Sequence, residues 1–153
     1  MRPPREFEER ADVRFLATRE AGHDALVLSV HGEIDLETAP MLHEALLPIL
    51  ELERGAVVID LCEVAFMDST GAHVLLDALE RLTAQKRRLG IACREHGQVH
   101  RLLAVLGLLD SVAVHRSRRS AIFGGEERIR AHAGGYRPRR SFGPTLRSLR
   151  PRR

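Results

Sequence analysis

Hydrophobic and polar positions along this chain follow two different periods in turn. Short runs that are almost wholly apolar predict buried strands. These runs lie at residues 25–32, 56–61, 89–93 and 112–114. Between them, apolar residues recur every three or four positions, as on the buried face of a helix. They mark three helices, around Leu42–Leu50, Val74–Leu82 and Val99–Leu106. Strands that alternate with helices in this way predict an α/β domain with right-handed crossovers.

The two ends of the chain lack this pattern. Residues 1–11 are charged, carry two prolines and predict a flexible leader. An alternating run at 13–17 predicts an edge strand, which a turn at 22–24 joins to the first buried strand. Apolar density collapses beyond residue 116. We therefore expect a single domain over residues 12–120 and a disordered, arginine-rich tail over residues 121–153.

Local chemistry predicts where the helices begin and end. Thr38 is expected to accept a hydrogen bond from an N–H of the first helix, and Pro40 is tolerated in a first turn. Lys86-Arg87-Arg88 is expected to complement the negative end of the second helix.

Composition favours a globular domain with an aliphatic core. Hydrophobic residues make up 44% of the 153 residues, whereas aromatic residues make up only 4% and tryptophan is absent. A chain of this length buries roughly two-thirds of its unfolded surface without staples. Cys62 and Cys93 follow apolar runs and form no CxxC pair, so we interpret them as small core residues. A disulfide framework, a zinc site and a redox role are not expected.

Charge divides the chain into an acidic body and a basic tail. Residues 116–153 contain 12 arginines and two glutamates, a balance of +10, whereas residues 1–115 have a balance of −7. Nucleic-acid contact by the tail is the less favoured interpretation, because Tyr136 offers little base stacking and no folded reader accompanies it. A solvated extension is favoured, and a tail that rests on the acidic domain is a third interpretation.

Targeting signals are missing from the pattern as well. No run approaches the roughly 18 uninterrupted apolar residues of a membrane span, and the N-terminus lacks an apolar signal region. We expect a cytoplasmic protein without a membrane span. No motif calls for a cofactor, and none is predicted.

The polar segment Asp68-Ser69-Thr70-Gly71 lies between a predicted strand and a long predicted helix. Backbone N–H groups at such a corner lack helical partners, and the helix dipole favours an acceptor or an anion there. One of the three short polar residues must cap the helix. Capping is one interpretation of the segment. Presentation of a hydroxyl for phosphorylation, which adds nearly two negative charges, is the other, and the spacing does not choose between them.

Two segments resemble the markers of the STAS-domain anti-sigma factor antagonists. Residues 57–61 and 64–71, a Val-Val-Ile-Asp-Leu strand and then Val-Ala-Phe-Met-Asp-Ser-Thr-Gly, resemble the family's signature. Residues 30–35, Val-His-Gly-Glu-Ile-Asp, resemble its second marker, a Gly-Glu-(Leu/Ile)-Asp strand end. The resemblance covers roughly residues 12–116. It implies a small α/β fold in which a mixed sheet is backed by helices.

The resemblance also implies a regulatory switch and not an enzyme. In this family the unphosphorylated antagonist binds a kinase-type anti-sigma factor and frees a sigma factor. The kinase phosphorylates the serine after the aspartate, which is Ser69 here, and a PP2C-type serine phosphatase reverses the reaction. Thr70 would be the helix cap or a secondary site. A phosphate beside Asp68 is costly to bury against acidic groups, so phosphorylation should switch binding off.

Further predicted partner contacts flank this corner. Glu33 and Asp35 have two interpretations: a strand-end turn in which Asp35 assists the next helix start, and a contact that orients the kinase. Ala72-His73 departs from the aliphatic residue and glycine that the family more often has, which changes the surface that a partner meets. The predicted partner-binding residues are Glu33, Asp35, Asp68, Ser69, Thr70, Gly71 and His73.

Two chemical alternatives lack supporting motifs. Ser69, His73 and Asp77 are spaced as a helical stack, but no Gly-x-Ser-x-Gly elbow accompanies them, so we predict no catalytic residue. His96 and His100 lie four residues apart without a third ligand near in sequence. We interpret them as solvated residues at a helix start, and we predict no metal site.

A second function class stays open. A STAS module can also serve as an accessory subunit of a lipid or anion transport system, without phosphorylation. The serine that follows Asp68 favours the switch.

Overall fold

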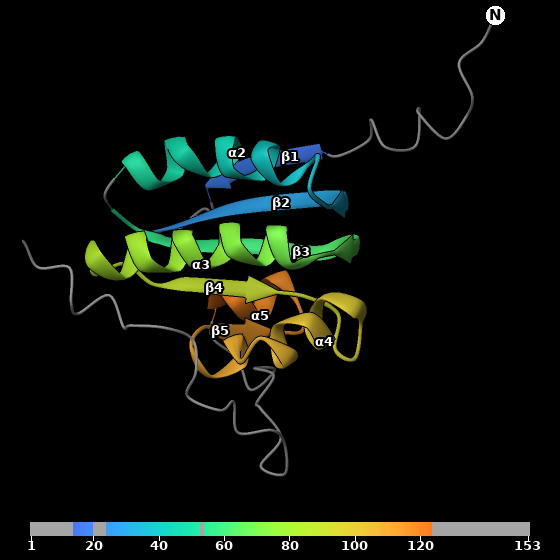
Figure 1. Cartoon of the computed structure of the whole chain (residues 1–153). Helices are drawn as coiled ribbons and strands as arrows, with labels where there is room; N and C mark the ends of the chain where they lie inside the picture. Colours follow the sequence, from blue (N-terminus) through green and yellow to red (C-terminus); the bar gives the residue numbers. More distant parts are fainter. Residues whose placement is uncertain (1–13, 20–23, 53, 124–153) are drawn as a thin grey trace, which may run out of the picture.

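The strands form one five-stranded mixed sheet in the computed structural model of this chain, which describes residues 14–19, 24–52 and 54–123 (Figure 1). The strands are β1 (Arg14–Arg19), β2 (Ala25–Ile34), β3 (Ala56–Met67), β4 (Leu89–Ala92) and β5 (Ala113–His115). They lie in the order β1-β2-β3-β4-β5. β1 runs antiparallel to β2, and the other neighbouring pairs are parallel. The predicted α/β class and the edge position of the first strand are confirmed.

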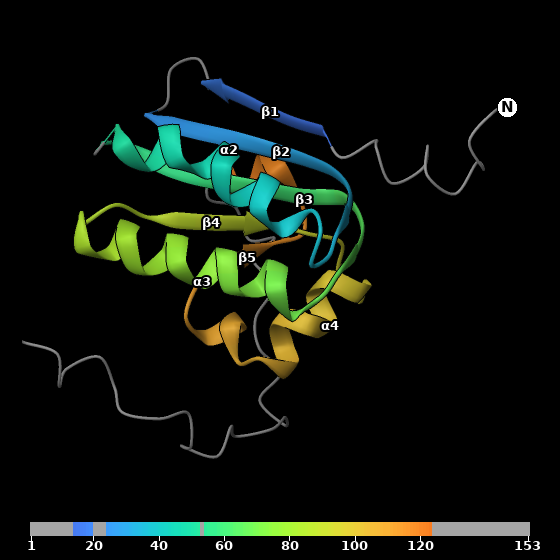
Figure 2. The same cartoon turned by 45° about the horizontal axis from the view of Figure 1, so that its top comes forward.

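Helices cover both faces of this sheet (Figures 1 and 2). α2 (Ala39–Glu51) and α3 (Ser69–Ala84) pack against each other on one face. α5 (Arg118–Phe123) lies on the opposite face, against β3, β4 and β5. α4 (Gln98–Val105) packs against β3 and α3, and a short 3₁₀ helix, η1 (Leu108–Asp110), follows it.

The core is aliphatic, as the composition predicts. Leu28, Ile59 and Leu75 are among the largest fully buried side chains, and they belong to the cluster beneath α2 and α3. β3 is the middle strand of the sheet, and its first half is buried on both faces. Ile59 faces the cluster, whereas Val58 lies beside Ala121 of α5, against the opposite face. Because both faces are covered, this strand is apolar at nearly every position of its first half.

β3 is longer than its apolar run predicts. It continues past Leu61 because its pairing with β2 continues as far as the pair Ile34 and Met67, across two irregularities in register. β4 pairs only with residues 57–60 of β3. The second half of β3 therefore extends beyond β4, and it carries the chain to the start of α3.

Arg87, in the basic cluster after α3, does not act as predicted. Arg87 is buried, and its guanidinium reaches the end of the preceding helix instead of its own. Its Nη1 donates to the carbonyl of Ile49 at 3.1 Å, and its Nε donates to that of Gly55 at 2.7 Å. The C-terminal carbonyls of a helix lack helical partners and favour a cation. Arg87 supplies one to α2, because the sheet places the two segments side by side.

α5 is absent from the sequence prediction, because polar contacts anchor much of this short helix. His115 Nδ1 and Ser120 Oγ lie 3.0 Å apart, and both residues are buried. Arg118 Nη2 donates to Thr18 Oγ1 at 3.1 Å, which ties the helix to the edge strand. α5 extends past residue 120, where the domain was predicted to end.

The predicted leader at 1–11 and residues 124–153 of the predicted tail lie outside the described residues. Within the described part of the chain, no helix has both the length and the apolar character needed to cross a bilayer.

Candidate functional site at the Asp68–Gly71 corner

The corner between β3 and α3 is capped by Asp68. Its backbone is extended, with φ −101° and ψ −175°, and its carboxylate accepts from the N–H groups of the first turn. Oδ1 lies 2.9 Å from the Thr70 nitrogen and 3.3 Å from the Gly71 nitrogen. Asp68 is therefore the N-cap. Capping was one of the two roles predicted for Thr70, and Thr70 does not perform it.

The two hydroxyl groups of the corner differ in their surroundings. Thr70 is half-buried, and its hydroxyl donates to Asp68 Oδ1, the oxygen that also caps the helix. Ser69 is exposed at the first position of α3, and the described residues make no hydrogen bond to its side chain. The capping carboxylate thus engages the Thr70 hydroxyl and leaves the Ser69 hydroxyl facing solvent.

Gly71 lies inside the corner and not on its surface. It is buried, and a β-carbon at this position would lie 2.6 Å from Ile34 Cγ2 and 2.7 Å from Met67 Cγ. Contacts this short do not occur between carbon atoms, so the first turn of α3 approaches the ends of β2 and β3 only because residue 71 has no side chain. The glycine of the motif positions the corner.

The turn after β2 is closed by Asp35 and Thr38. Asp35 Oδ1 accepts from the N–H of Glu37 at 3.0 Å and from that of Thr38 at 3.1 Å. The Thr38 hydroxyl accepts from the Asp35 N–H at 2.9 Å and donates to the Glu33 carbonyl at 2.8 Å. The sequence predicted that Thr38 accepts a hydrogen bond from an N–H of the first turn of α2. That prediction is wrong, because the Thr38 hydroxyl is engaged by the turn that precedes the helix. Asp35 organises the start of this helix, in agreement with one of its two interpretations.

The fold brings the two marker segments together. The N–H of Asp68 donates to the carbonyl of Ile34 at 3.0 Å. One residue earlier, Met67 pairs with Ile34 in the sheet, and Phe66 pairs with Glu33. The turn that contains Glu33 and the corner that contains Ser69 thus belong to one surface at the carboxyl ends of β2 and β3, where loops of parallel sheets commonly bind partners.

This surface combines acidic groups with the exposed apolar side chain of Leu36. Glu33 and Glu37 are exposed, and Asp35 and Asp68 are half-buried. Leu36 lies between two of these acids and is 73% exposed, the largest value among the large hydrophobic residues that the structure describes. Leu36 is not among the partner contacts predicted from the sequence. A leucine within an otherwise polar turn could have indicated a partner contact, because a residue in a surface turn does not pack into the core.

The helix that follows carries His73 and Asp77 on its exposed side. No hydrogen bond among the described residues joins Ser69 to His73 or His73 to Asp77. The three residues thus share a helix surface without the contacts through which a base activates a serine.

The other two candidate groups have structural roles. The Nδ1 atom of His100 accepts from the N–H of His96 at 2.9 Å, which closes the turn before α4. The described residues contain no group of three potential metal ligands. Burial raises the pKa of both cysteine thiols to about 12, and Asp60 contributes at Cys62. Cys93 belongs to the core cluster beneath α2 and α3, as predicted, whereas Cys62 is half-buried and lies outside that cluster. Both thiols stay protonated at neutral pH.

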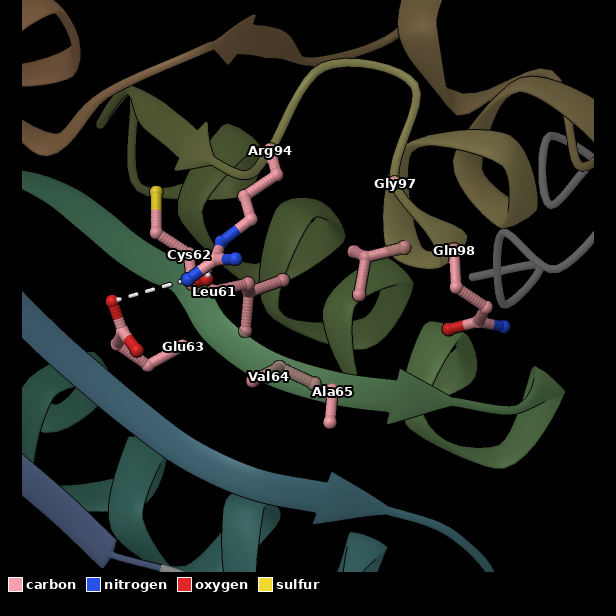
Figure 3. Close-up of a pocket in the computed structure, with 9 residues that line it drawn as sticks. Leu61, Cys62, Glu63, Val64, Ala65, Arg94, Gly97 and Gln98 are labelled. Atoms are coloured by element: carbon pink, nitrogen blue, oxygen red, sulfur yellow. Dashed lines mark hydrogen bonds and ion pairs between the residues drawn. The ribbon is translucent and has the colours of Figure 1, made fainter.

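A groove of about 360 Å³ runs beside the second half of β3 (Figure 3). Residues 61–65 form one wall, and the loop between β4 and α4 forms the other. Arg94 reaches across from this loop, and its Nε donates to the Cys62 carbonyl at 2.8 Å. Its Nη2 lies 3.6 Å from Glu63 Oε1, an ion pair that solvent screens because both side chains are more than half exposed.

Known proteins resemble this chain in sequence and in fold. The family model described as STAS domain matches residues 16–121. An anti-sigma-B factor antagonist of Listeria monocytogenes is 36% identical over 100 residues, which are 63% of this chain and 83% of that protein. An anti-sigma-F factor antagonist of Mycobacterium tuberculosis is 39% identical over 75 residues, 48% of this chain and 61% of that protein. The crystal structure of an anti-sigma factor antagonist from Mycobacterium paratuberculosis matches 72% of this chain and 91% of its own, with a TM-score of 0.66 and 28% identity.

Proposed function

Because this chain belongs to the STAS domain family, we propose that it is a cytoplasmic anti-sigma factor antagonist that phosphorylation of Ser69 switches off. The unphosphorylated form binds a kinase-type anti-sigma factor and so frees a sigma factor. A PP2C-type serine phosphatase restores the binding form. The protein needs neither a catalytic residue nor a cofactor of its own for this role.

One observation carries the proposal: the carboxylate of Asp68 performs the capping, which leaves Ser69 available. A helix start needs only one capping side chain, and Asp68 accepts from two N–H groups there. Thr70 donates its hydroxyl to the same carboxylate. Ser69 is exposed and takes no part in the cap. A kinase can reach the Ser69 hydroxyl without disrupting the helix start, whereas Thr70 would have to leave its hydrogen bond first, which makes it a secondary site.

The charges around Ser69 explain why a phosphate would act as a switch. Phosphorylation adds nearly two negative charges. The start of α3 tolerates an anion while the surface is in water, because the helix dipole and solvent both stabilise it. A bound partner removes that solvent, and the phosphate then lies beside Asp68 and near the acidic turn of Glu33 and Asp35. Burying a dianion among carboxylates costs more than burying a serine, so the partner dissociates.

The exposed parts of the same surface define the proposed partner contacts. Glu33 and His73 are exposed on either side of the corner, and Asp35 is half-buried between Glu33 and Leu36. Leu36 supplies the apolar contact that a protein interface needs near its centre. We add Leu36 to the contacts predicted from the sequence.

Incubation with ATP and candidate kinase-type anti-sigma factors, followed by mass spectrometry, tests the proposal. We expect phosphate on Ser69 of the unaltered chain and of the control variant Thr70→Val. Ser69→Ala should bind the kinase but remain unmodified, and Ser69→Asp should bind more weakly. Stoichiometric phosphate on Thr70 of Ser69→Ala would contradict the residue assignment. If the chain neither binds any candidate kinase nor is phosphorylated by one, the result is that expected of a transport accessory subunit.

A further inference from the structure

On its side away from β2, the last residue of β3 is paired with a side chain in place of β4. β4 ends at Ala92 and pairs only as far as Asp60, so it does not reach the end of β3. At Met67 the amide of Gln98 takes its place. Gln98 Oε1 accepts from the Met67 N–H at 2.8 Å, and Gln98 Nε2 donates to the Met67 carbonyl at 2.7 Å. One side chain thus satisfies both backbone groups of Met67, as a neighbouring strand would.

We infer that Gln98 is a positioning residue for the Ser69 corner, an inference that rests on the proposed function. Gln98 is the first residue of α4 and lies 31 positions from Met67 in the chain. Figure 3 shows it at the end of the groove toward which β3 runs, on the wall opposite that strand. It holds Met67, the residue that precedes Asp68, and through Asp68 it acts on Ser69.

The contacts on the two sides of β3 show how this positioning works. Gln98 holds Met67 from the α4 side, and the Ile34 carbonyl holds the N–H of Asp68 at 3.0 Å from the β2 side. The chain is thus clamped at two successive residues immediately before the cap. The Asp68 carboxylate can accept from Thr70 and Gly71 only while its own backbone keeps its direction. Loss of the Gln98 amide releases one side of this clamp.

A fixed corner matters for both steps of the proposed switch. A kinase must receive the Ser69 hydroxyl in line with the phosphate of its nucleotide, and each rotation that is already restricted lowers the entropic cost of that alignment. A partner that binds the unphosphorylated corner likewise gains from a surface that is already ordered. Gln98 therefore sets how well Ser69 is presented, although it touches neither the kinase nor the nucleotide.

Gln85 provides a matched control at the far end of α3. Its amide also uses both ends, since Nε2 donates to the Leu50 carbonyl at 2.9 Å and Oε1 accepts from Arg87 at 2.9 Å. Gln98→Ala and Gln85→Ala thus remove the same chemical group and similar contacts. Both are expected to lower the melting temperature of the full chain, and only Gln98→Ala should loosen the corner.

Native-state amide hydrogen exchange, followed by NMR on the full chain, measures this difference. The Met67 amide loses its acceptor directly in Gln98→Ala and is not diagnostic. The amides of Asp68, Thr70 and Gly71 keep their acceptors, so faster exchange there reports a mobile corner. We expect their exchange to accelerate about fivefold or more, the factor for one hydrogen bond of ordinary net strength. Unchanged exchange at these three amides, or equal acceleration in Gln85→Ala, would overturn the inference.

The variant Gln98→Glu adds a test that a general loss of stability would not reproduce. An ionised carboxylate accepts from the Met67 N–H but repels the Met67 carbonyl, whereas the protonated acid can donate to it. Protection of the Asp68, Thr70 and Gly71 amides in this variant should rise as the pH falls through the carboxyl's titration. If the protection of these amides in Gln98→Glu depends on pH no more than it does in the unaltered chain, the inference is wrong.

Phosphorylation by the kinase identified under the proposed function is the second readout. We expect Gln98→Ala to be phosphorylated on Ser69 at least severalfold more slowly than Gln85→Ala at equal folded concentration. Equal rates would overturn the inference while leaving the proposed function intact. An unaltered chain that no kinase modifies would contradict the proposed function, and the exchange measurements would then decide the inference alone.

Discussion

Replacing Asp68 by alanine is expected to lower the free energy of unfolding by about 2 kcal/mol. The change removes the oxygen that accepts from the N–H groups of Thr70 and Gly71 and from the Thr70 hydroxyl. Loss of an N-cap side chain costs about 1 kcal/mol. The Thr70 hydroxyl then loses a charged acceptor, which contributes about 1 kcal/mol more because the site is only half-buried.

Two further variants separate these contributions. Asp68→Asn keeps an acceptor oxygen but loses the charge that the helix dipole favours, so it should cost only about 0.5 kcal/mol. Thr70→Val removes the hydroxyl alone. Combined with Asp68→Ala it forms a double-mutant cycle, and the coupling between the two side chains should be about 1 kcal/mol.

Urea unfolding at 25 °C measures all of these variants. For a slope typical of a small domain, a loss of 2 kcal/mol lowers the midpoint by about 1 M urea. The same change should release the Thr70 hydroxyl, so a kinase that recognises this corner is expected to modify Thr70 more readily in Asp68→Ala. Unchanged midpoints for Asp68→Ala, or a coupling near zero, would refute the view that one carboxylate both caps α3 and engages Thr70.

Arg87→Met should lower the free energy of unfolding by about 3 kcal/mol in urea denaturation, because it leaves the Ile49 and Gly55 carbonyls without their charged donor. The control Arg88→Met changes an exposed neighbour and should alter the free energy of unfolding by less than about 0.5 kcal/mol. Equal effects of the two variants would contradict the buried role of Arg87. Burial raises the pKa of each thiol from 9.0 to about 12, which leaves little thiolate in the folded chain. Iodoacetamide at pH 8 should therefore label Cys62 and Cys93 at least about tenfold more slowly in the folded chain than in urea, and labelling at equal rates would contradict this. Removal of residues 124–153, which carry nine arginines and two glutamates, should leave the melting temperature nearly unchanged and weaken the salt dependence of binding to a charged partner or to nonspecific nucleic acid. Identical binding by the two chains at every salt concentration would mean that the tail has no such role.

The main elements of the fold could be predicted from the order of residues alone. A strand covered on both faces is recognisable because consecutive positions of Ala56–Ile59 are all apolar, and the helices are recognisable by their spacing of three and four. The two marker segments were likewise identified by short runs of residues. Such features depend on neighbours in the chain, so no knowledge of the tertiary structure is needed to find them.

Other features depend on groups that only the folded chain brings together. Which side chain caps α3 was undecided, since Asp68, Ser69 and Thr70 all have an oxygen that can accept, and backbone direction at the end of β3 selects Asp68. Arg87 was assigned to the wrong helix, and the role of Gln98 was missed.

The physical reason is the distance along the chain between the partners. Arg87 binds a carbonyl 38 residues away, and Gln98 binds one 31 residues away. The sequence does not identify the distant carbonyl to which a glutamine or arginine side chain will donate, because many backbone groups could accept from it. The sheet selects one by setting β3 between β2 and β4 and by ending β4 before β3. Local pattern thus determined the elements, and their packing decided which hydroxyl remains exposed at the corner.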